Sequence, residues 1–240
     1  QLNESQKLPT VHKNGPIMVI AGAGSGKTRV LTYRIAYLME MGVDPFSILA
    51  LTFTNKAARE MKSRISLIVG EEKSKNLWMG TFHSIFARIL RSEAELLGYS
   101  SNFTIYDTQD SERLIATIIK ELKLDKDLYK YRNIRNRISS LKNNLVTIKA
   151  YLNNQELIQQ DNESRRPMFG KVYQTYVNRC FKASAMDFDD LMLKTNELLN
   201  RFPEVLAKYQ ERFKYIHVDE YQDTNHSQYL IIKALADRYE

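Results

Sequence analysis

A glycine-rich stretch of eight residues carries the clearest chemistry in the sequence. It runs from Ala21 to Thr28 and reads Ala-Gly-Ala-Gly-Ser-Gly-Lys-Thr. Backbone N–H groups of such a loop converge on an anion, and the N-terminus of the helix that follows adds partial positive charge. In this arrangement Lys27 reaches the β- and γ-phosphates of a nucleotide, and the Thr28 hydroxyl ligates Mg²⁺. The sequence therefore predicts a phosphate-binding loop, although Ala21 stands where the usual pattern has Gly.

Two adjacent carboxylates, Asp219 and Glu220, supply what such a loop lacks. They follow the apolar run 215–218, which has the length of a strand. Neighbouring residues at a strand end point in different directions, so the two groups can take different roles. We predict that Asp219 holds Mg²⁺ and that Glu220 positions and deprotonates the attacking water. An Asp-Glu pair alone is typical of a turn; it indicates nucleotide hydrolysis here because the phosphate-binding loop accompanies it.

A parallel sheet with flanking helices would place these groups together. Short apolar runs predict strands at 17–21, 48–53, 77–82, 103–107 and 215–219. Apolar residues at helical spacing predict helices from about 28 to a stop at Gly42, and over 58–68, 85–90 and 190–199. Alternating strands and helices indicate an α/β domain with a parallel sheet.

The middle of the chain has a different pattern. Between 108 and 185 we predict no strand, and apolar residues recur at helical spacing over 115–122, 134–145 and 169–180. The polar stretch 159–167 predicts a loop. We therefore divide the chain into an α/β domain, residues 1–106 and 187–240, and an inserted all-helical subdomain, residues 107–186.

Positive charge is concentrated in that insertion. The formal net charge of the chain is +7, and residues 107–186 hold 15 Lys and Arg against 9 Asp and Glu, whereas the remainder is nearly balanced. A localised basic surface is a candidate for contact with a phosphate backbone, and Arg132, Arg135 and Lys142 are the candidate residues. On charge alone, a solvated helical face is the slightly favoured explanation.

Cysteine content and apolar runs bear on the compartment. The single cysteine, Cys180, cannot form an internal disulfide and favours a reducing compartment. No stretch reaches the roughly 18 apolar residues of a membrane span, and the first residues do not have the pattern of a secretory signal. We expect a cytoplasmic protein.

Several further runs, taken in order along the chain, resemble motifs of the UvrD/Rep/PcrA group of superfamily 1 DNA helicases. The runs similar to the two nucleotide motifs are Ala21–Arg29, including the departure at Ala21, and Asp219–Asn225. Those similar to the remaining motifs are Leu2–Gln6 for the N-terminal glutamine motif, Leu51–Ala58 and Gly80–His83 for single-strand-binding motifs, and Asp187–Leu191 for the return from the helical insertion.

The resemblance implies the first of two RecA-like domains of an ATP- and Mg²⁺-dependent motor that moves 3′ to 5′ on single-stranded DNA and meets duplex junctions in repair or replication. It implies that Gln6 reads the adenine edge. The implied nucleotide-binding set is Gln6, Ala21, Gly22, Ala23, Gly24, Ser25, Gly26, Lys27, Thr28, Arg29 and Gln222, with Lys27 and Glu220 catalytic. The implied DNA-binding set is Thr52, Phe53, Thr54, Asn55, Thr81 and His83.

The resemblance also implies that Tyr221 and Gln222 link hydrolysis to DNA binding. A second RecA-like domain supplies arginines in this group, so we expect the isolated chain to bind nucleotide and hydrolyse it weakly. Pro9 is expected to stop or delay a helix after Gln6. Phe53 suits either a base stack or a core position, and we expect His217 to be a satisfied core residue.

Other classes of protein fit parts of the pattern. The front of a helicase–nuclease subunit similar to RecB or AddA would differ by a nuclease motif beyond residue 240. Another P-loop enzyme, such as a small-molecule kinase, would have an acceptor-binding lid and no requirement for DNA. A binding module with a relic nucleotide site is disfavoured by the intact Lys27, Thr28, Asp219 and Glu220.

Overall fold

The computed structural model describes residues 2–12, 15–22 and 24–239. They form two compact units. The first comprises Gln1–Ile85, Leu199–Thr224 and Gln228–Glu240, and the second comprises Phe86–Leu198 and Asn225–Ser227. The limits predicted for the helical insertion, 107–186, stay a prediction.

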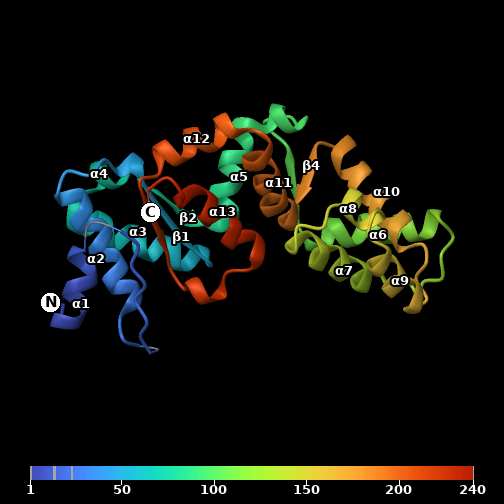
Figure 1. The fold of residues 1–240 in the computed structure, drawn as a ribbon, viewed down its shortest axis with the longest axis horizontal. Coiled ribbons are helices and arrows are strands. Elements are labelled where there is room, and N and C mark those ends of the chain that lie inside the picture. The colour runs from blue at the N-terminus through green and yellow to red at the C-terminus, as the bar shows by residue number, and fades with distance from the viewer. Residues whose placement is uncertain (1, 13–14, 23, 240) are drawn as a thin grey trace. The chain divides into compact units, whose positions relative to one another are not determined.

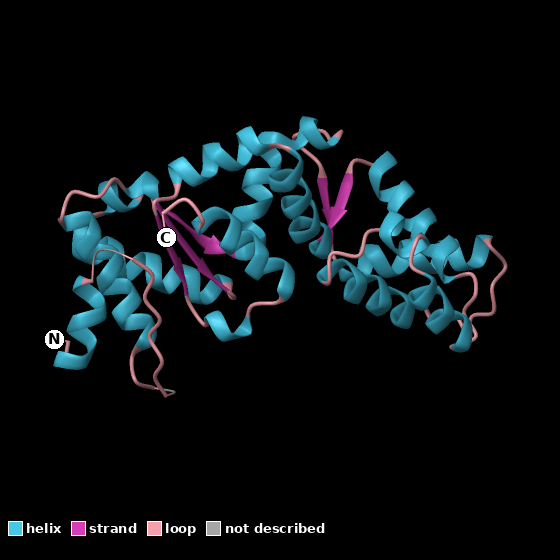
Figure 2. Ribbon diagram, viewed as in Figure 1, coloured by secondary structure: helices cyan, strands magenta, loops and turns pink. Residues whose placement is uncertain are grey.

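A three-stranded parallel sheet forms the centre of the first unit (Figure 2). Its strands are β1 (Ile48–Thr52), β2 (Trp78–Thr81) and β5 (Tyr215–Val218), in the order β2-β1-β5. The last residue of β1, Thr52, pairs with the last residue of β2, Thr81, so their carboxyl ends meet at one edge. Of the five predicted strands, 48–53, 77–82 and 215–219 are confirmed in this sheet, and so is the α/β class.

Two helices pack on this sheet and enclose an apolar core. They are α2 (Lys27–Glu40) and α3 (Asn55–Val69), and the core includes Ile35, Leu38, Ile48, Met61 and Ile65. Thr54 caps the start of α3, where its side chain accepts from the N–H of Ala57, and Gly42 follows α2 at φ +88°. The remaining helices of this unit are α1 (Glu4–Val11), α4 (Glu71–Ser74), α12 (Pro203–Arg212) and the greater part of α13 (His226–Ala236).

The strand predicted at 17–21 is wrong. In the described part of the chain this segment is irregular, and β5 has β1 as its strand partner. Ile20 is 87% exposed and Met18 is 70% exposed. An apolar run specifies a preference for burial, but a strand also needs a neighbouring strand with which to exchange N–H and C=O hydrogen bonds, and this segment pairs with none of the described strands.

The helix α1 corrects a second expectation, because it continues through Pro9. Its start is fixed by a reciprocal capping pair: the Asn3 side chain accepts from the N–H of Gln6, and the Gln6 side chain accepts from the N–H of Asn3. Pro9 lies in the last turn, so its missing N–H and its ring affect only the end of the helix.

The second unit is mainly helical, as its apolar spacing predicts (Figure 1). Its helices are α6 (Thr108–Glu121), α7 (Tyr131–Asn143), α8 (Ile148–Leu152), α9 (Gln155–Glu163) and α10 (Phe169–Lys182). Their core contains Ile115, Ile134, Tyr173 and Tyr176. The predicted loop 159–167 is partly wrong, since α9 extends to Glu163; its polar sequence reflects an exposed helix.

A small parallel sheet completes this unit. It joins β3 (Thr104–Tyr106) to β4 (Ala185–Asp187), so the strand predicted at 103–107 exists but lies in a separate sheet. Three helices contribute residues to both units: α5 (Phe82–Glu93), α11 (Phe188–Arg201) and α13, whose first two residues belong to the second unit. No helix in the described ranges is long and apolar enough to cross a membrane.

Candidate nucleotide and DNA-binding site

The glycine-rich loop leads directly into α2. Gly26 precedes the helix with φ +88°, and Gly24 has φ +76°, conformations that other residues rarely adopt. The Gly22 carbonyl accepts from the N–H of Ser25 at 3.3 Å and from its hydroxyl at 2.7 Å, which closes the loop. Since α2 starts at Lys27, the loop lies at the positive end of the helix dipole. One predicted loop residue, Ala23, lies outside the described residues.

Lys27 and Gln6 both contact this loop. The Lys27 Nζ donates to the carbonyl of Ala21 at 2.8 Å and to that of Gly22 at 3.3 Å. The Gln6 Nε2 donates to the carbonyl of Ser25 at 2.9 Å. Both side-chain donors therefore hydrogen-bond to backbone carbonyls of the glycine-rich loop.

Thr28 and Asp219 come together from distant parts of the sequence. The Thr28 Oγ1 donates to Asp219 Oδ2 at 3.4 Å. The N–H of Asp219 donates to the carbonyl of Leu51 at 2.9 Å, which fixes it at the end of β5 beside β1. Burial and the neighbouring Glu220 raise the pKa of Asp219, while Thr28 and Lys27 act in the opposite direction. A hydroxyl and a carboxylate are hard oxygen donors of the kind that Mg²⁺ prefers, so the two residues fit this ion.

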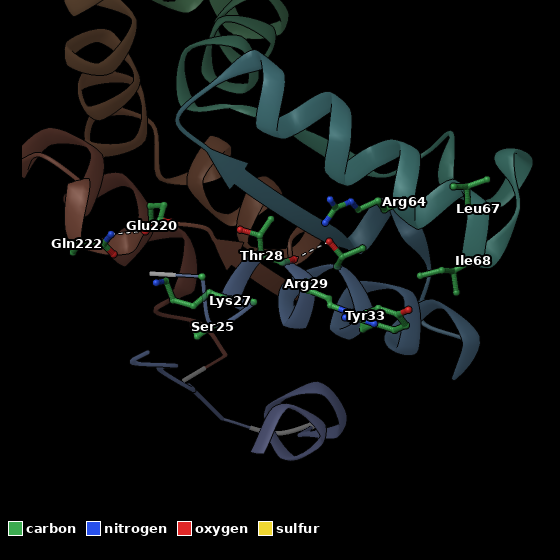
Figure 3. A pocket seen from close by; sticks show the side chains of 13 residues that line it. Ser25, Lys27, Thr28, Arg29, Tyr33, Arg64, Leu67, Ile68, Glu220 and Gln222 are labelled. Carbon is green, nitrogen blue, oxygen red and sulfur yellow. Dashed lines mark hydrogen bonds between the residues drawn. The ribbon is translucent and has the colours of Figure 1, made fainter. Parts of the chain in front are cut away.

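Glu220 has a left-handed backbone conformation, with φ +51°. This conformation is uncommon outside glycine and is often found at functional sites. Its carboxylate accepts from the side-chain amide of Gln222 (Figure 3), and Gln222 lies in a short 3₁₀ turn, Tyr221–Asp223, that directly follows Glu220. The turn directs Glu220 toward the pocket rather than into the sheet.

Lys27, Thr28 and Glu220 line a cavity of about 1000 Å³. Residues predicted from sequence line part of it: Gly24, Ser25, Gly26, Lys27, Thr28, Arg29, Glu220 and Gln222. Figure 3 shows that its side chains come from α2, from α3 and from the segment after β5. The guanidinium of Arg29 lies 5.7 Å from the ring centre of Tyr33.

The side of the cavity that α3 contributes was not predicted from the sequence. It consists of Arg64, Leu67 and Ile68. Thr32 and Tyr33 of α2 also line the cavity and were not predicted either. Leu67 is 85% exposed and Ile68 is 42% exposed, although the helical spacing placed Ile68 on the buried face. Two adjacent apolar residues at the end of an otherwise polar helix face were the available signal.

The predicted DNA-binding residues cluster at the carboxyl ends of β1 and β2. The Phe53 and Phe82 rings lie 5.2 Å apart, so Phe53 is half-buried against the edge of the core. Asn55 is exposed at the first position of α3. The structure brings together Thr52, Phe53, Thr54, Asn55, Thr81 and His83.

The three hydroxyls in this set are engaged or buried. Thr52 is 4% exposed and Thr81 is 8% exposed. The Thr81 Oγ1 accepts from the N–H of Ser84 at 3.2 Å, and Thr54 caps α3. The surface groups at this edge are therefore Asn55 and the first N–H groups of α3, which suit a phosphate contact.

The basic candidates in the second unit do not share one surface. Lys142 is buried, and its Nζ lies 2.7 Å from Asp187 Oδ2 and 2.8 Å from Asp190 Oδ1, so its assignment as a phosphate contact is wrong. Arg135 donates to Thr108 at 3.4 Å. A cavity of about 680 Å³ nearby is instead lined by Lys120, Lys126, Lys130 and Arg132, with Tyr129 and Tyr131.

His217 is buried in β5, but its Nε2 has no hydrogen-bond partner among the described residues. The expectation of a satisfied core histidine is therefore wrong for this nitrogen. Burial, with a smaller contribution from Arg34, lowers the pKa of His217 to about 3, so the ring is neutral. Tyr173 and Tyr176 are core packing residues, and their hydroxyls donate to the carbonyl of Val146 and to Asp187 respectively.

Comparisons with known proteins agree with this geometry. The family model of the UvrD/REP helicase N-terminal domain matches residues 2–240. A curated protein of Staphylococcus epidermidis named ATP-dependent DNA helicase PcrA is 45% identical over 240 residues, which is 100% of this chain and 32% of that protein. A protein of Staphylococcus aureus with the same name is 44% identical over the same length. The chain spans about a third of the length of these curated relatives.

Proposed function

This chain belongs to the UvrD/REP helicase family, and we propose that it is the ATP-binding part of a DNA helicase that moves 3′ to 5′ on single-stranded DNA. The observation that carries the proposal is the meeting of Thr28 and Asp219 beside the glycine-rich loop. Relatives that are named ATP-dependent DNA helicases support the choice of nucleotide and of DNA.

The residues of the pocket have different roles in ATP hydrolysis. Lys27 and the loop N–H groups hold the β- and γ-phosphates, and Thr28 and Asp219 hold Mg²⁺. When bound, Mg²⁺ supplies positive charge that offsets the charge developing on the phosphate oxygens. Glu220 accepts a proton from the attacking water, and its bond to Gln222 orients its carboxylate.

DNA binding shares a sheet edge with this pocket. The Leu51 carbonyl accepts from Asp219, and Thr52 and Phe53 are the next residues along the chain. Phe53, on which a base would stack, is two positions after Leu51, and the start of α3, where phosphates would bind, is four positions after it. We propose that this short segment from Leu51 to Phe53, together with Tyr221 and Gln222, couples ATP turnover to the affinity for single-stranded DNA.

The basic cavity of the second unit suits duplex DNA at a junction. Its lining combines four cationic side chains with the aromatic rings of Tyr129 and Tyr131. Neutralising two of them in a Lys126→Gln, Lys130→Gln variant should weaken binding to tailed duplex. The slope of affinity against salt should become shallower by about one unit for each phosphate that the variant no longer neutralises. The same variant should leave ATP turnover on single-stranded DNA unchanged.

Other parts of the proposal concern the whole protein. We propose that it works in the cytoplasm, in DNA repair or replication. A second RecA-like domain would supply arginines that stabilise the transition state, a contribution of about 10³–10⁵ in rate. The isolated 240 residues should then bind nucleotide but turn it over slowly.

The first experiment measures ATP turnover by the intact protein with and without single-stranded DNA. The Glu220→Gln variant should lose roughly 100- to 10,000-fold in turnover while it keeps ATP binding. Glu72→Gln, an exposed carboxylate change in α4, is the matched control and should behave as the wild type. Turnover that is indifferent to DNA would contradict the helicase assignment, and unwinding of 5′-tailed rather than 3′-tailed duplex would contradict the direction.

A further inference from the structure

Arg34 is a buried cation in the middle of α2. It is 8% exposed, and burial lowers the pKa of its guanidinium from the ordinary value. Its Nη1 donates to the backbone carbonyl of Pro9 at 3.0 Å and to that of His12. Its described hydrogen bonds thus go to the carbonyls of another helix. A buried charge with this set of partners needs an explanation.

The two carbonyls lie at the C-terminal end of α1. The last carbonyls of a helix have no partner within the helix and carry partial negative charge, so a cation there is favourable. No basic residue occurs in the last turn of α1 itself. Arg34 therefore supplies, from α2, the cation that caps α1.

The rest of α1 contributes little to its own docking. Of its residues, Pro9 and Thr10 are buried, whereas Leu8 is 73% exposed and Val11 is 46% exposed. A helix with so little buried apolar surface depends on its polar contacts for its position. Arg34 makes two of these contacts, and Gln6 makes a third with the Ser25 carbonyl.

Gln6 is held closely against the glycine-rich loop. A Cβ atom added to Gly26 would lie 3.0 Å from the Gln6 Nε2, so the two segments are in contact. Both ends of the amide are engaged: Nε2 donates to Ser25, and Oε1 accepts from Asn3. A small shift of α1 would therefore move the amide away from the loop.

We propose that Arg34 is a positioning residue for base selection: by capping α1 it holds Gln6 where the amide can exchange its present partners for the edge of adenine. The inference rests on the proposed function, in which ATP is the nucleotide and Gln6 contacts its base. An amide matches adenine, which offers the N6 donor and the N7 acceptor on one edge. Guanine offers two acceptors on that edge, so a displaced Gln6 should lower the preference of the site for ATP over GTP.

The experiment measures the dissociation constants of ATP and GTP for the intact protein, by fluorescence of a labelled nucleotide and its displacement. Arg34→Met should lower the preference for ATP over GTP about tenfold, the equivalent of one hydrogen bond. Gln6→Ala should lower it by a similar factor. In the double variant the Arg34 change should have no further effect on the preference, because Arg34 acts through Gln6.

Matched variants separate this role from general damage. Arg113→Met removes an exposed arginine from α6 and should leave the preference unchanged. The fluorescence of Trp78 shows whether Arg34→Met folds. If it does not, Arg34→Gln replaces it: this variant keeps a hydrogen-bond donor but loses the charge, so it should lower the preference for ATP over GTP less than tenfold. An unchanged preference in Arg34→Gln would contradict the proposal.

The remaining outcomes distinguish the inference from its premise. A preference that falls in Gln6→Ala but not in the Arg34 variants would overturn the role of Arg34 and leave the proposed function standing. A preference that falls further when Arg34→Met is added to Gln6→Ala would also overturn it. Equal binding of ATP and GTP by the wild type, or a preference unaffected by Gln6→Ala, would instead contradict the assigned base contact.

Discussion

Thr28 and Asp219 are 191 positions apart in the sequence, and their side-chain oxygens lie 3.4 Å apart in the structure. One is the second residue of α2, and the other follows the last residue of β5. The contact brings a hydroxyl and a carboxylate to the same side of the glycine-rich loop. The geometry of this pair leads to a prediction about metal dependence.

Changing the Thr28 hydroxyl or the Asp219 carboxylate should lower the affinity of the site for Mg²⁺. Thr28→Val keeps the shape of the side chain but removes the hydroxyl, and Asp219→Asn removes the negative charge. Both should raise the Mg²⁺ concentration needed for half-maximal ATP turnover, and Asp219→Asn should lower turnover on the order of 100-fold. The measurement is a Mg²⁺ titration of turnover at saturating ATP. Thr28→Ser, which keeps the hydroxyl, is the control; equal losses in Thr28→Ser and Thr28→Val would rule out the hydroxyl as a ligand.

Phe53 should contribute to the affinity for single-stranded DNA. Phe53→Leu removes the aromatic face that stacks on a base and keeps an apolar side chain against Phe82, so the protein should remain folded. We expect a loss of about 1–3 kcal/mol in binding free energy, measured by fluorescence anisotropy of a labelled oligonucleotide. Phe46→Leu is the control, because Phe46 is an exposed phenylalanine that lies before β1, at the opposite end of this strand from Phe53. Unchanged affinity in Phe53→Leu would assign Phe53 to the core alone.

Stability should depend on pH through His217. Its pKa is about 3 in the folded protein, against 6.5 for the ordinary side chain. As the pH falls from 6.5 toward 3, the unfolded chain binds a proton that the folded protein does not bind. The free energy of unfolding then falls by up to about 1.4 kcal/mol for each pH unit. Above pH 6.5 the ring is neutral in both states, and this dependence disappears.

A variant isolates the contribution of His217 from that of the other groups. Between pH 7 and pH 5 the free energy of unfolding of His217→Gln should fall less than that of the wild type, by about 2 kcal/mol. The fluorescence of Trp78 is a suitable signal in urea titrations, because it is the single tryptophan of the chain and lies in the same sheet. Parallel pH profiles for the two proteins would show that His217 is protonated in the folded state.

Much of the lining of the candidate nucleotide pocket was predictable because its chemistry restricts residue type. Lys27, Thr28 and Glu220 line one cavity, and Asp219 contacts Thr28. The Lys27 ammonium contacts carbonyls of the glycine-rich loop. The side of the cavity that α3 contributes was not predictable in this way. Leu67 has the residue type of a core position, and nothing in helical spacing tells an exposed apolar residue from a buried one.

The errors elsewhere arose where a residue's partner is distant in the sequence. The apolar run 17–21 predicts a strand, but its pairing depends on which edge of the sheet is free, and spacing along the chain does not contain this information. Lys142 looked like a surface cation because α7 is rich in basic residues. Its carboxylate partners are 45 and 48 positions away, so only the three-dimensional structure reveals that the charge is neutralised.

Lys142 should stabilise the second unit strongly. The Lys142 residue is 1% exposed, and its ammonium joins α7 to Asp187, the last residue of β4, and to Asp190 in the first turn of α11. The Tyr176 hydroxyl of α10 donates to Asp187 at 2.8 Å. Burial acts to raise the pKa of Asp187, and Lys142 outweighs it and holds this pKa below the ordinary value. Burial and the charge of Asp187 raise the pKa of Asp190 to about 6.

Lys142→Met would leave two buried carboxylates without their cation. Breaking a buried pair in this way costs about 3–5 kcal/mol, so we expect such a loss in the free energy of unfolding at pH 7. Without Lys142 both carboxyls should have raised pKa values in the folded protein. The folded variant then binds more protons than its unfolded chain as the pH falls from 7 to 5, and the deficit relative to the wild type should shrink.

Hydrogen exchange measured by mass spectrometry can locate this effect, because it reports on α7, α10 and α11 separately. Exchange in these helices should speed up in Lys142→Met, and adding Asp190→Asn should restore part of the protection by removing one unpaired charge. Lys171→Met, which removes an exposed lysine from α10, should leave exchange unchanged. A deficit below about 1 kcal/mol, or one that grows on acidification, would show that the buried charges are compensated by other groups and that Lys142 does not hold these helices together.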